Sequence, residues 1–247
     1  GIKGIGFIGC LNYLLEKGIY KKENIKKIIG TSAGSIIAAF LAVGYSIKEI
    51  NDLALEINYG LMRDINAENI LNFFQDFGLD SGKELERITE IIIKKKIKDN
   101  LTFKELYDKK GIELVINAVC VNDQTVEYFN YENYPDLKIA KAIRMSSSIP
   151  IVFKPVTFNN KLYIDGGVLD NLSVNLCKNN FLGFYIANFN NFDKIKSIDE
   201  YLYAIITGMI THLNNDKYNK YKEKIISIDL SNINPINFDL SKEEKKK

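Results

Sequence analysis

The sequence is poor in the residue types on which several common kinds of site depend. It contains one histidine, so a serine–histidine–aspartate triad would rest on that single side chain. Its three cysteines lie far apart, which predicts buried free thiols in a reducing compartment. No group of histidines and cysteines has the spacing of metal ligands, and no aspartate-rich calcium loop is present. We therefore expect neither a metal nor a cofactor.

Arginine and long apolar runs are also scarce. Only three of the 33 basic side chains are arginine, and the lysine excess accompanies many Ile, Asn, Tyr and Phe residues, all with AT-rich codons. This bias indicates genomic composition and not a functional basic surface. The formal net charge of +2 gives no electrostatic preference for nucleic acid, so we expect no such partner. No apolar run reaches the roughly 20 residues of a membrane-spanning helix.

What the chain does contain is enough apolar sequence for one large α/β domain. Its 247 residues are 46% hydrophobic, and no repeat or low-complexity linker divides them. Predicted strands alternate with helical patterns, which favours a largely parallel sheet covered on both faces. Strands are expected at 25–29, 182–187 and 225–229, hairpins at 112–129 (strands 112–121 and 125–129) and 155–164, and a long helix at 198–213. Ser46 with Glu49 and Thr102 with Glu105 are expected to cap two further helices.

A serine between two glycines marks the turn around which the chain is organised. The strand at 25–29 leads to Gly30, Ser32 lies at the turn, and an apolar helical pattern follows Gly34. A strand, a sharp turn and a helix form the context of a nucleophile elbow, which exposes the serine hydroxyl above the sheet. A Cβ atom at either glycine is expected to collide with the neighbouring strand or helix. The alternative is a glycine-rich turn whose serine caps the helix.

A nucleophilic serine needs a base, and Asp165 is a better candidate than the only histidine. His212 lies late in the predicted helix at 198–213, where a surface position is favoured. Asp165 directly follows a predicted strand, at the edge of the sheet where α/β proteins bind ligands. Gly166 and Gly167 would let another backbone approach closely. Burial would raise the pKa of this carboxyl, as a base acting alone requires; the alternative is an aspartate that only shapes a turn.

In several ordered motifs the sequence resembles the patatin-like phospholipases. Met145 stands where that family usually has alanine, and residues 60–110 carry no match and are the best candidate for a cover or lid. The matching segments are the glycine-containing start at 1–18, Gly30-Thr31-Ser32-Ala33-Gly34, the serine-rich segment at 142–150 ending in Pro150, Asp165-Gly166-Gly167 with Asn171, and a closing segment at 238–244.

The resemblance implies both a fold and a site. The fold would be a three-layer α/β/α sandwich with a central, mostly parallel sheet, in a single domain over residues 1–247. The site would be a dyad in which Ser32 is the nucleophile and Asp165 the general base. The backbone N–H groups of Ile2, Lys3 and Gly4 would form the oxyanion hole.

The implied function is that of a lipid acyl hydrolase of phospholipase A type, acting at a membrane or micelle surface through an acyl-enzyme on Ser32. Two alternatives stay open: a lipid transacylase with the same dyad, and a membrane-associated patatin-fold module without turnover. The family's first strand and most of its early glycines are missing, so the chain looks trimmed at both ends. We expect a cytoplasmic protein that is peripheral to membranes. Because the start looks trimmed, the sequence does not decide whether a signal peptide precedes it.

Overall fold

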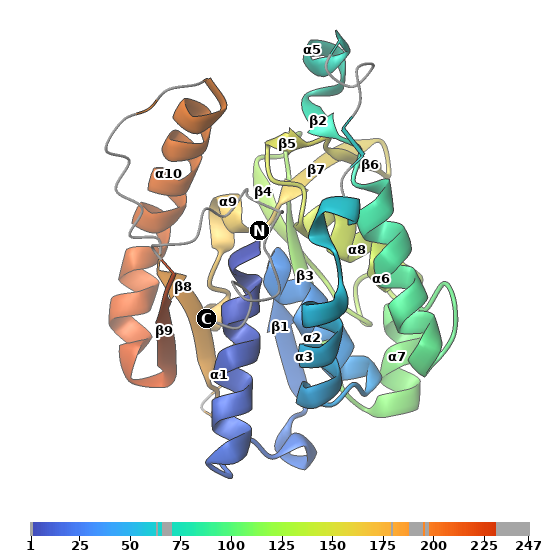
Figure 1. The fold of residues 1–247 in the computed structure, drawn as a ribbon, viewed down its shortest axis with the longest axis vertical. Coiled ribbons are helices and arrows are strands. Elements are labelled where there is room, and N and C mark those ends of the chain that lie inside the picture. Colours follow the sequence, from blue (N-terminus) through green and yellow to red (C-terminus); the bar gives the residue numbers. More distant parts are fainter. Residues whose placement is uncertain are drawn as a thin grey trace.

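The computed structural model describes residues 2–62, 64–65, 71–178, 180–187, 195 and 198–230 (Figure 1). The closing segment at 238–244 lies outside the described residues. The α- and 3-10 (η) helices are η1 (Ile2–Gly4), α1 (Ile5–Glu16), η2 (Lys22–Asn24), α2 (Ala33–Val43), α3 (Ile47–Glu56), η3 (Tyr59–Met62), α5 (Phe73–Asp76), α6 (Lys83–Lys96), α7 (Phe103–Lys110), α8 (Ile139–Ser146), α9 (Gly167–Asp170), η4 (Val174–Leu176), α10 (Ile198–Tyr221) and η5 (Lys222–Lys224). The strands are β1 (Lys27–Gly30), β2 (Gly78–Asp80), β3 (Glu113–Cys120), β4 (Thr125–Phe129), β5 (Ile151–Phe153), β6 (Val156–Phe158), β7 (Lys161–Asp165), β8 (Gly183–Ala187) and β9 (Ile225–Asp229).

Local signals in the sequence set the starts of two surface helices. Helix α3 begins after Ser46, whose hydroxyl accepts the backbone N–H of Glu49 while the Glu49 carboxylate accepts the N–H of Ser46. Thr102 and Glu105 make the same reciprocal pair before α7. Each pair satisfies two backbone donors that the first turn of a helix leaves free. Both predicted capping boxes are confirmed.

The main sheet is mixed, and the expectation of a mostly parallel sheet is wrong for it. Its strands follow the order β1-β3-β7-β6, with β4 also paired to β3. Among these strands β1 alone is parallel to its neighbour, whereas β4, β7 and β6 pair antiparallel. The β3–β4 and β6–β7 hairpins account for two of these three antiparallel pairings, because a tight turn reverses the chain and places the next strand antiparallel. The third joins β7 to β3, which are not consecutive in the chain.

This mixed pairing brings two distant strand ends together. Gly30, the last residue of β1, pairs with Ile116, and Asp165, the last residue of β7, pairs with Ala118. Since β1 runs parallel to β3 and β7 runs antiparallel to it, the two strands point toward each other along β3. Their C-terminal ends therefore meet near the middle of β3.

Strand β3 is buried on both faces. Ile116 and Ala118 belong to the main hydrophobic core, which they share with residues of α2 such as Phe40. Asn117 points to the opposite face, as alternation along a strand requires. There its amide donates to the carbonyl of Asp170 (2.8 Å), the last residue of α9. Helices α2, α3 and α6 thus lie across the sheet from α9 and α10, as Figure 1 also shows.

The second half of the stretch that the sequence suggested as a cover, residues 83–110 of 60–110, is part of this core. Ile92 and Ile93 of α6 and Leu106 of α7 are buried in it. Their burial makes residues 83–110 a packed layer of the body and not a lid over it.

The C-terminal region forms a second, smaller cluster. Strands β8 and β9 pair in parallel, and Tyr185 of β8 and Ile225 of β9 pack together with residues after α9. Helix α10 packs against α9, and Lys217 of α10 forms an ion pair with Asp170 of α9 (2.5 Å). Within the described part of the chain, no helix combines the length and the apolar character needed to span a membrane.

Candidate active site

Ser32 lies at the turn between β1 and α2 and has an unusual backbone conformation. Its φ is +52° and its ψ is −127°, a region that residues with a Cβ atom rarely adopt. The N–H of Gly34 donates to the carbonyl of Thr31 (2.8 Å), and the hydroxyl of Ser35 donates to the carbonyl of Ser32 (2.6 Å). These bonds hold the strained turn. The segment therefore has the geometry of a nucleophile elbow.

The two glycines that flank the Ser32 turn differ in whether a Cβ atom would fit at their position. A Cβ atom on Gly30 would lie 2.6 Å from the Gly34 carbonyl oxygen and 2.6 Å from the Cα of Ser35, so only glycine fits there. A Cβ atom on Gly34 would meet nothing closer than the Phe7 ring at 3.6 Å, an ordinary contact. The expected collision is confirmed at Gly30. It is wrong at Gly34, because a Cβ atom there would meet the Phe7 ring of α1 at an ordinary distance and no closer backbone atom.

The structure brings the two predicted catalytic side chains together. The Ser32 hydroxyl donates a hydrogen bond of 2.5 Å to Oδ2 of Asp165. This contact follows from the meeting of β1 and β7 along β3, since Ser32 comes two residues after β1 and Asp165 ends β7. Asp165 is 5% exposed, so its carboxylate is largely removed from water.

Burial also sets the acidity of this carboxyl. It raises the pKa of Asp165 above the ordinary value, against the opposing effects of the Ser32 hydroxyl and the Gly167 N–H, which donates to Oδ1 (2.7 Å). A desolvated carboxylate is a stronger base than one in water, because burial penalises the charged form. The environment of Asp165 is therefore suited to accept a proton from Ser32.

Gly166 allows the loop after Asp165 to approach β3, whereas Gly167 leaves room for side chains near the loop itself. A Cβ atom on Gly166 would lie 2.3 Å from Oδ1 and 2.6 Å from the carbonyl oxygen of Asn117. A Cβ atom on Gly167 would lie 3.0 Å from Oδ1 of Asp165 itself. Asn117 was not predicted to support the site, although a polar residue inside an otherwise apolar strand indicates a buried polar contact. Its side chain holds the end of α9 in place.

The predicted oxyanion segment lies beside the elbow. Ile2, Lys3 and Gly4 form η1, and a Cβ atom on Gly4 would lie 2.7 Å from the Cβ of Ala33, the residue after Ser32. Lys3 is 4% exposed. Burial lowers the pKa of its ammonium group, and the negative charge of Asp229 opposes this change. The backbone of η1 is therefore packed directly against the turn that carries Ser32.

Three consecutive serines, the serine segment 146–148, contact both members of the pair. The Ser146 hydroxyl oxygen accepts the backbone N–H of Ser32 (2.8 Å). The Ser148 carbonyl accepts the backbone N–H of Asp165 (2.9 Å). The sequence pointed to this segment only through its family resemblance and suggested no role for it. The structure gives it one, because it fixes the backbones of Ser32 and Asp165 relative to each other.

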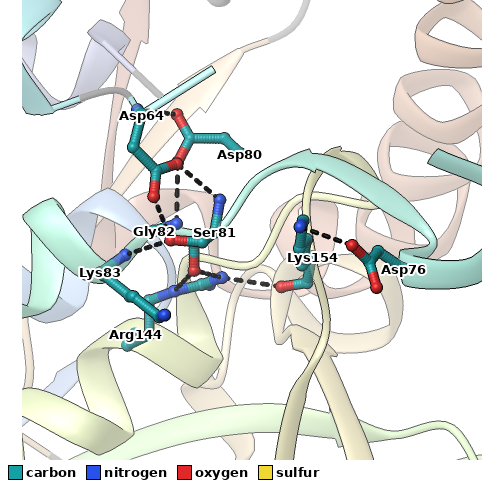
Figure 2. Close-up of polar contacts among 8 residues, drawn as sticks. All are labelled: Asp64, Asp76, Asp80, Ser81, Gly82, Lys83, Arg144 and Lys154. Atoms are coloured by element: carbon teal, nitrogen blue, oxygen red, sulfur yellow. Dashed lines mark hydrogen bonds and ion pairs between the residues drawn. The ribbon is translucent and has the colours of Figure 1, made fainter. Parts of the chain in front are cut away.

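The Arg144 side chain joins the serine segment to the segments around β2 and β5, and Figure 2 shows its contacts with Ser81 and Lys154. This side chain is 2% exposed and donates to the Ser148 hydroxyl (2.5 Å) and to the carbonyls of Ser81 (2.7 Å) and Lys154 (2.7 Å). Burial lowers the pKa of its guanidinium to about 10, and Asp80 opposes this shift. In the sequence, a lone arginine within an apolar helical segment could have indicated this buried role. Arg144 ties α8 to the segments around β2 and β5.

Two carboxyl groups face each other beside this arginine (Figure 2). Asp80 accepts the backbone N–H groups of Asp64 (3.2 Å) and Gly82 (2.8 Å). Burial and the neighbouring carboxyl of Asp64 raise the pKa of Asp80 to about 6. Burial acts on Asp64 too, but hydrogen bonds from Asp80 and Ser81 outweigh it and lower the pKa of Asp64. The two shifts run in opposite directions, so Asp80 binds a proton more readily than Asp64.

Two cavities meet at Ser32. A narrow cavity of about 120 Å³ runs beneath α2 and between α3 and α6, and its walls are almost entirely apolar. A wider cavity of about 1060 Å³ lies toward α9 and β8 and has many polar groups in its walls. Asp165 lines the wide cavity, whereas Ser147 lines the narrow one. The residues common to both are Gly4, Ser32, Ala33, Ile37 and Ile149.

Other polar groups lie away from this junction. His212 is exposed on α10, as predicted, and is not among the lining residues of either cavity. Cys120, Asp123 and Glu127 on the β3–β4 hairpin bring three potential metal-ligand atoms within 4.8 Å of one another. Asp123 is paired with Lys161, and Glu127 accepts the hydroxyl of Tyr163, so both carboxylates are already engaged.

Comparisons with known proteins point to one family. The family described as patatin-like phospholipase matches residues 1–178. The "Probable lipid hydrolase 463L" of Invertebrate iridescent virus 6 is 31% identical over 95% of this chain and 76% of its own length. The "Uncharacterized protein R571" of Acanthamoeba polyphaga mimivirus is 30% identical over 99% of this chain and 86% of its own.

Two solved structures share the fold. VipD from Legionella pneumophila gives a TM-score of 0.56 at 17% identity, over 100% of this chain and 62% of VipD. The type III effector ExoU of Pseudomonas aeruginosa gives 0.56 at 15% identity, over 100% of this chain and 48% of ExoU. This chain thus spans less than two thirds of either protein. With the match over residues 1–178, the chain belongs to the patatin-like phospholipase family.

Proposed function

We propose that the protein is a lipid acyl hydrolase of phospholipase A type in which Ser32 is the nucleophile and Asp165 the general base. The observation that carries the proposal is the 2.5 Å hydrogen bond from the Ser32 hydroxyl to the Asp165 carboxylate, at the junction of the two cavities. The family match and a relative named as a probable lipid hydrolase support the substrate class.

In the acylation step Asp165 accepts the Ser32 proton while Ser32 Oγ attacks the carbonyl carbon of the ester. The tetrahedral intermediate then collapses, the bond to the alcohol oxygen breaks, and the proton held by Asp165 passes to that oxygen. The alcohol leaves and the acyl group stays on Ser32. The existing hydrogen bond places the donor and acceptor at the distance that general-base catalysis needs.

In the deacylation step water attacks the acyl-enzyme. Asp165 lines the wide cavity, so a water molecule that enters from this side can give its proton to the carboxylate. The intermediate collapses, the proton returns to Ser32 Oγ, and the fatty acid is released. One carboxylate can serve both steps because each step returns it to its ionised state.

Negative charge develops on the carbonyl oxygen in both steps, and η1 is the segment positioned to stabilise it. Its backbone lies against Ala33, next to the nucleophile. We assign the N–H groups of Ile2, Lys3 and Gly4 to this role. A preorganised oxyanion donor typically contributes about 3–4 kcal/mol to transition-state stabilisation.

The two cavities would hold different parts of the substrate. The narrow apolar cavity suits an acyl chain, because transfer of methylene groups from water to an apolar wall is favourable. The wide cavity, with polar groups in its walls, suits the rest of the lipid and the attacking water. A substrate that straddles Ser32 in this way places its ester carbonyl beside the nucleophile.

Fluorophosphonate labelling followed by mass spectrometry tests the proposal. We expect one modified residue, Ser32, and loss of both labelling and hydrolysis in Ser32→Ala. His212→Ala is the matched control, since it removes the only histidine from an exposed position outside the site. It should keep activity within a few fold of the wild type. A loss of about a thousandfold in His212→Ala, or labelling that persists in Ser32→Ala, would contradict the proposed dyad.

A further inference from the structure

Ser147 has no role in the catalytic steps described above, yet its hydroxyl lacks the hydrogen bond that a buried hydroxyl normally makes. The residue is 7% exposed, and its Oγ is buried without a hydrogen-bond partner among the described residues. The hydroxyls of its neighbours Ser146 and Ser148 are both engaged. A buried hydroxyl without a partner lowers stability, so its retention in a packed site needs an explanation.

The position of Ser147 indicates which part of a substrate it would meet. It lines the narrow cavity together with Ser32, and is not among the residues lining the wide one. Asp165 lines the wide cavity and is absent from the narrow one. The two side chains therefore lie on different sides of the nucleophile. Asp165 faces the leaving group and water, whereas Ser147 lies beside the acyl group.

The Ser147 hydroxyl is also free to turn. Rotation about its single side-chain torsion moves Oγ between staggered positions. Since Oγ has no partner to give up among the described residues, this rotation breaks no hydrogen bond. The backbone stays fixed meanwhile, because the Ser147 N–H donates to Ile143 (2.9 Å) and its carbonyl accepts the N–H of Ile149 (2.9 Å).

We propose that Ser147 is a further catalytic residue, whose hydroxyl turns into the narrow cavity and donates a hydrogen bond to the carbonyl oxygen of the reacting acyl group. This inference rests on the proposed function. Ser147 forms no covalent bond and exchanges no proton. It adds a side-chain donor to the backbone donors of η1 on the oxygen where charge develops.

The test is the Ser147→Ala variant, assayed with an ester substrate and by the rate of fluorophosphonate labelling. We expect kcat to fall about 10- to 100-fold with KM changed less than about threefold, because the lost bond acts mainly in the transition state. Labelling of Ser32 should slow by a similar factor, since the phosphonyl oxygen occupies the same place. The Tm should stay level or rise, because alanine removes an unpaired hydroxyl.

Ser46→Ala is the control, since Ser46 is exposed, caps the start of α3 and lines neither cavity. It should lower the Tm by about 2–4 °C, as loss of a capping hydroxyl predicts, and leave kcat unchanged. The two variants should thus show opposite patterns. Ser147→Ala with unchanged kcat and labelling rate, or with a Tm loss larger than that of Ser46→Ala, would overturn the inference.

A crystal structure of the wild-type protein phosphonylated on Ser32 provides a second measurement that needs no variant. We expect Ser147 Oγ within about 2.5–3.2 Å of the phosphonyl oxygen. A hydroxyl that still points away from this oxygen would reject the role of Ser147. Labelling at Ser32 would leave the proposed function standing in that case, so the two failures are distinguishable.

Discussion

Asp165 combines a buried carboxylate with a hydrogen bond from the proposed nucleophile, and its protonation should control activity. Burial raises the pKa of this carboxyl above its ordinary value. Below that raised pKa the carboxyl holds a proton and cannot accept one from Ser32. We expect hydrolysis to fall as the pH is lowered through the raised pKa, with no inflection from a histidine. A pH profile of kcat/KM measures this, and an unchanged rate down to the ordinary range of aspartate would contradict it.

The same residue allows stability and activity to be separated. Because the native state binds this proton more tightly than the unfolded state, the contribution of Asp165 to stability falls as the pH rises through the shifted pKa. Asp165→Asn keeps the shape and removes the charge. We therefore expect turnover to be lost at pH 7–8 while the Tm stays level or rises. Residual turnover near the wild-type rate would show that Asp165 only shapes its loop.

The glycines of the elbow provide a matched pair of substitutions. Gly30→Ala places a Cβ atom 2.6 Å from backbone atoms of α2 and should lower the Tm strongly or prevent folding. Gly34→Ala meets only the Phe7 ring at 3.6 Å and adds a good helix former in the first turn of α2. Its Tm should stay within a few degrees of the wild type. Thermal unfolding of both proteins measures the contrast, and equal losses would contradict it.

At the scale of elements, the helix caps could be predicted from the sequence, whereas the contacts that hold the site residues in place could not. The capping boxes of α3 and α7 depend on residues three positions apart, so the sequence specifies them directly. Ser32 and Asp165 could be chosen because each follows a predicted strand. The hydrogen bond from the Ser32 backbone N–H to the Ser146 hydroxyl oxygen joins residues 114 positions apart. Such contacts depend on how α8 packs against the sheet, which no local pattern encodes.

Helices α3 and α6 form walls of the narrow cavity, so they should determine which acyl chains fit. Ala54 of α3 is buried and lines this cavity. Ala54→Phe should fill part of the space and lower the activity on long-chain esters relative to acetyl or butyryl esters by about tenfold or more. Glu56→Phe adds the same ring on the exposed side of α3 and should leave this ratio unchanged. A ratio that is equal in both variants would argue against an acyl chain in this cavity.

At the scale of the whole molecule, Asp170 joins regions that are far apart in the sequence. Its carboxylate accepts the Tyr128 hydroxyl of β4 (2.6 Å) and pairs with Lys217 of α10 (2.5 Å). We propose that residues 1–247 unfold as one domain. Lys217→Ala removes the cation from a buried carboxylate and should lower the stability of that single transition by about 1–3 kcal/mol. Calorimetry measures this, and two separate transitions in the wild type would contradict the single domain.

The parallel or antiparallel pairing of the strands in the main sheet could not be predicted from the sequence. Alternation of strands and helices favoured a parallel sheet, and the family resemblance agreed. The hairpins that break this pattern were themselves visible in the sequence at 112–129 and 155–164. Their effect on the sheet was not, because it depends on β7 pairing with β3 beside β1. The antiparallel β7 is nevertheless what points Asp165 toward the end of β1.

The unequal cavities on either side of Ser32 have a kinetic consequence. In the proposed reaction the alcohol product would depart through the wide cavity before water enters, whereas the fatty acid would withdraw from the narrow apolar cavity after the last chemical step. Release of the fatty acid would then limit turnover, increasingly so as the chain lengthens. Free fatty acids would act as competitive product inhibitors whose strength follows chain length, while the lyso product would inhibit weakly. The enzyme would thus slow as its own product accumulates in the surrounding lipid.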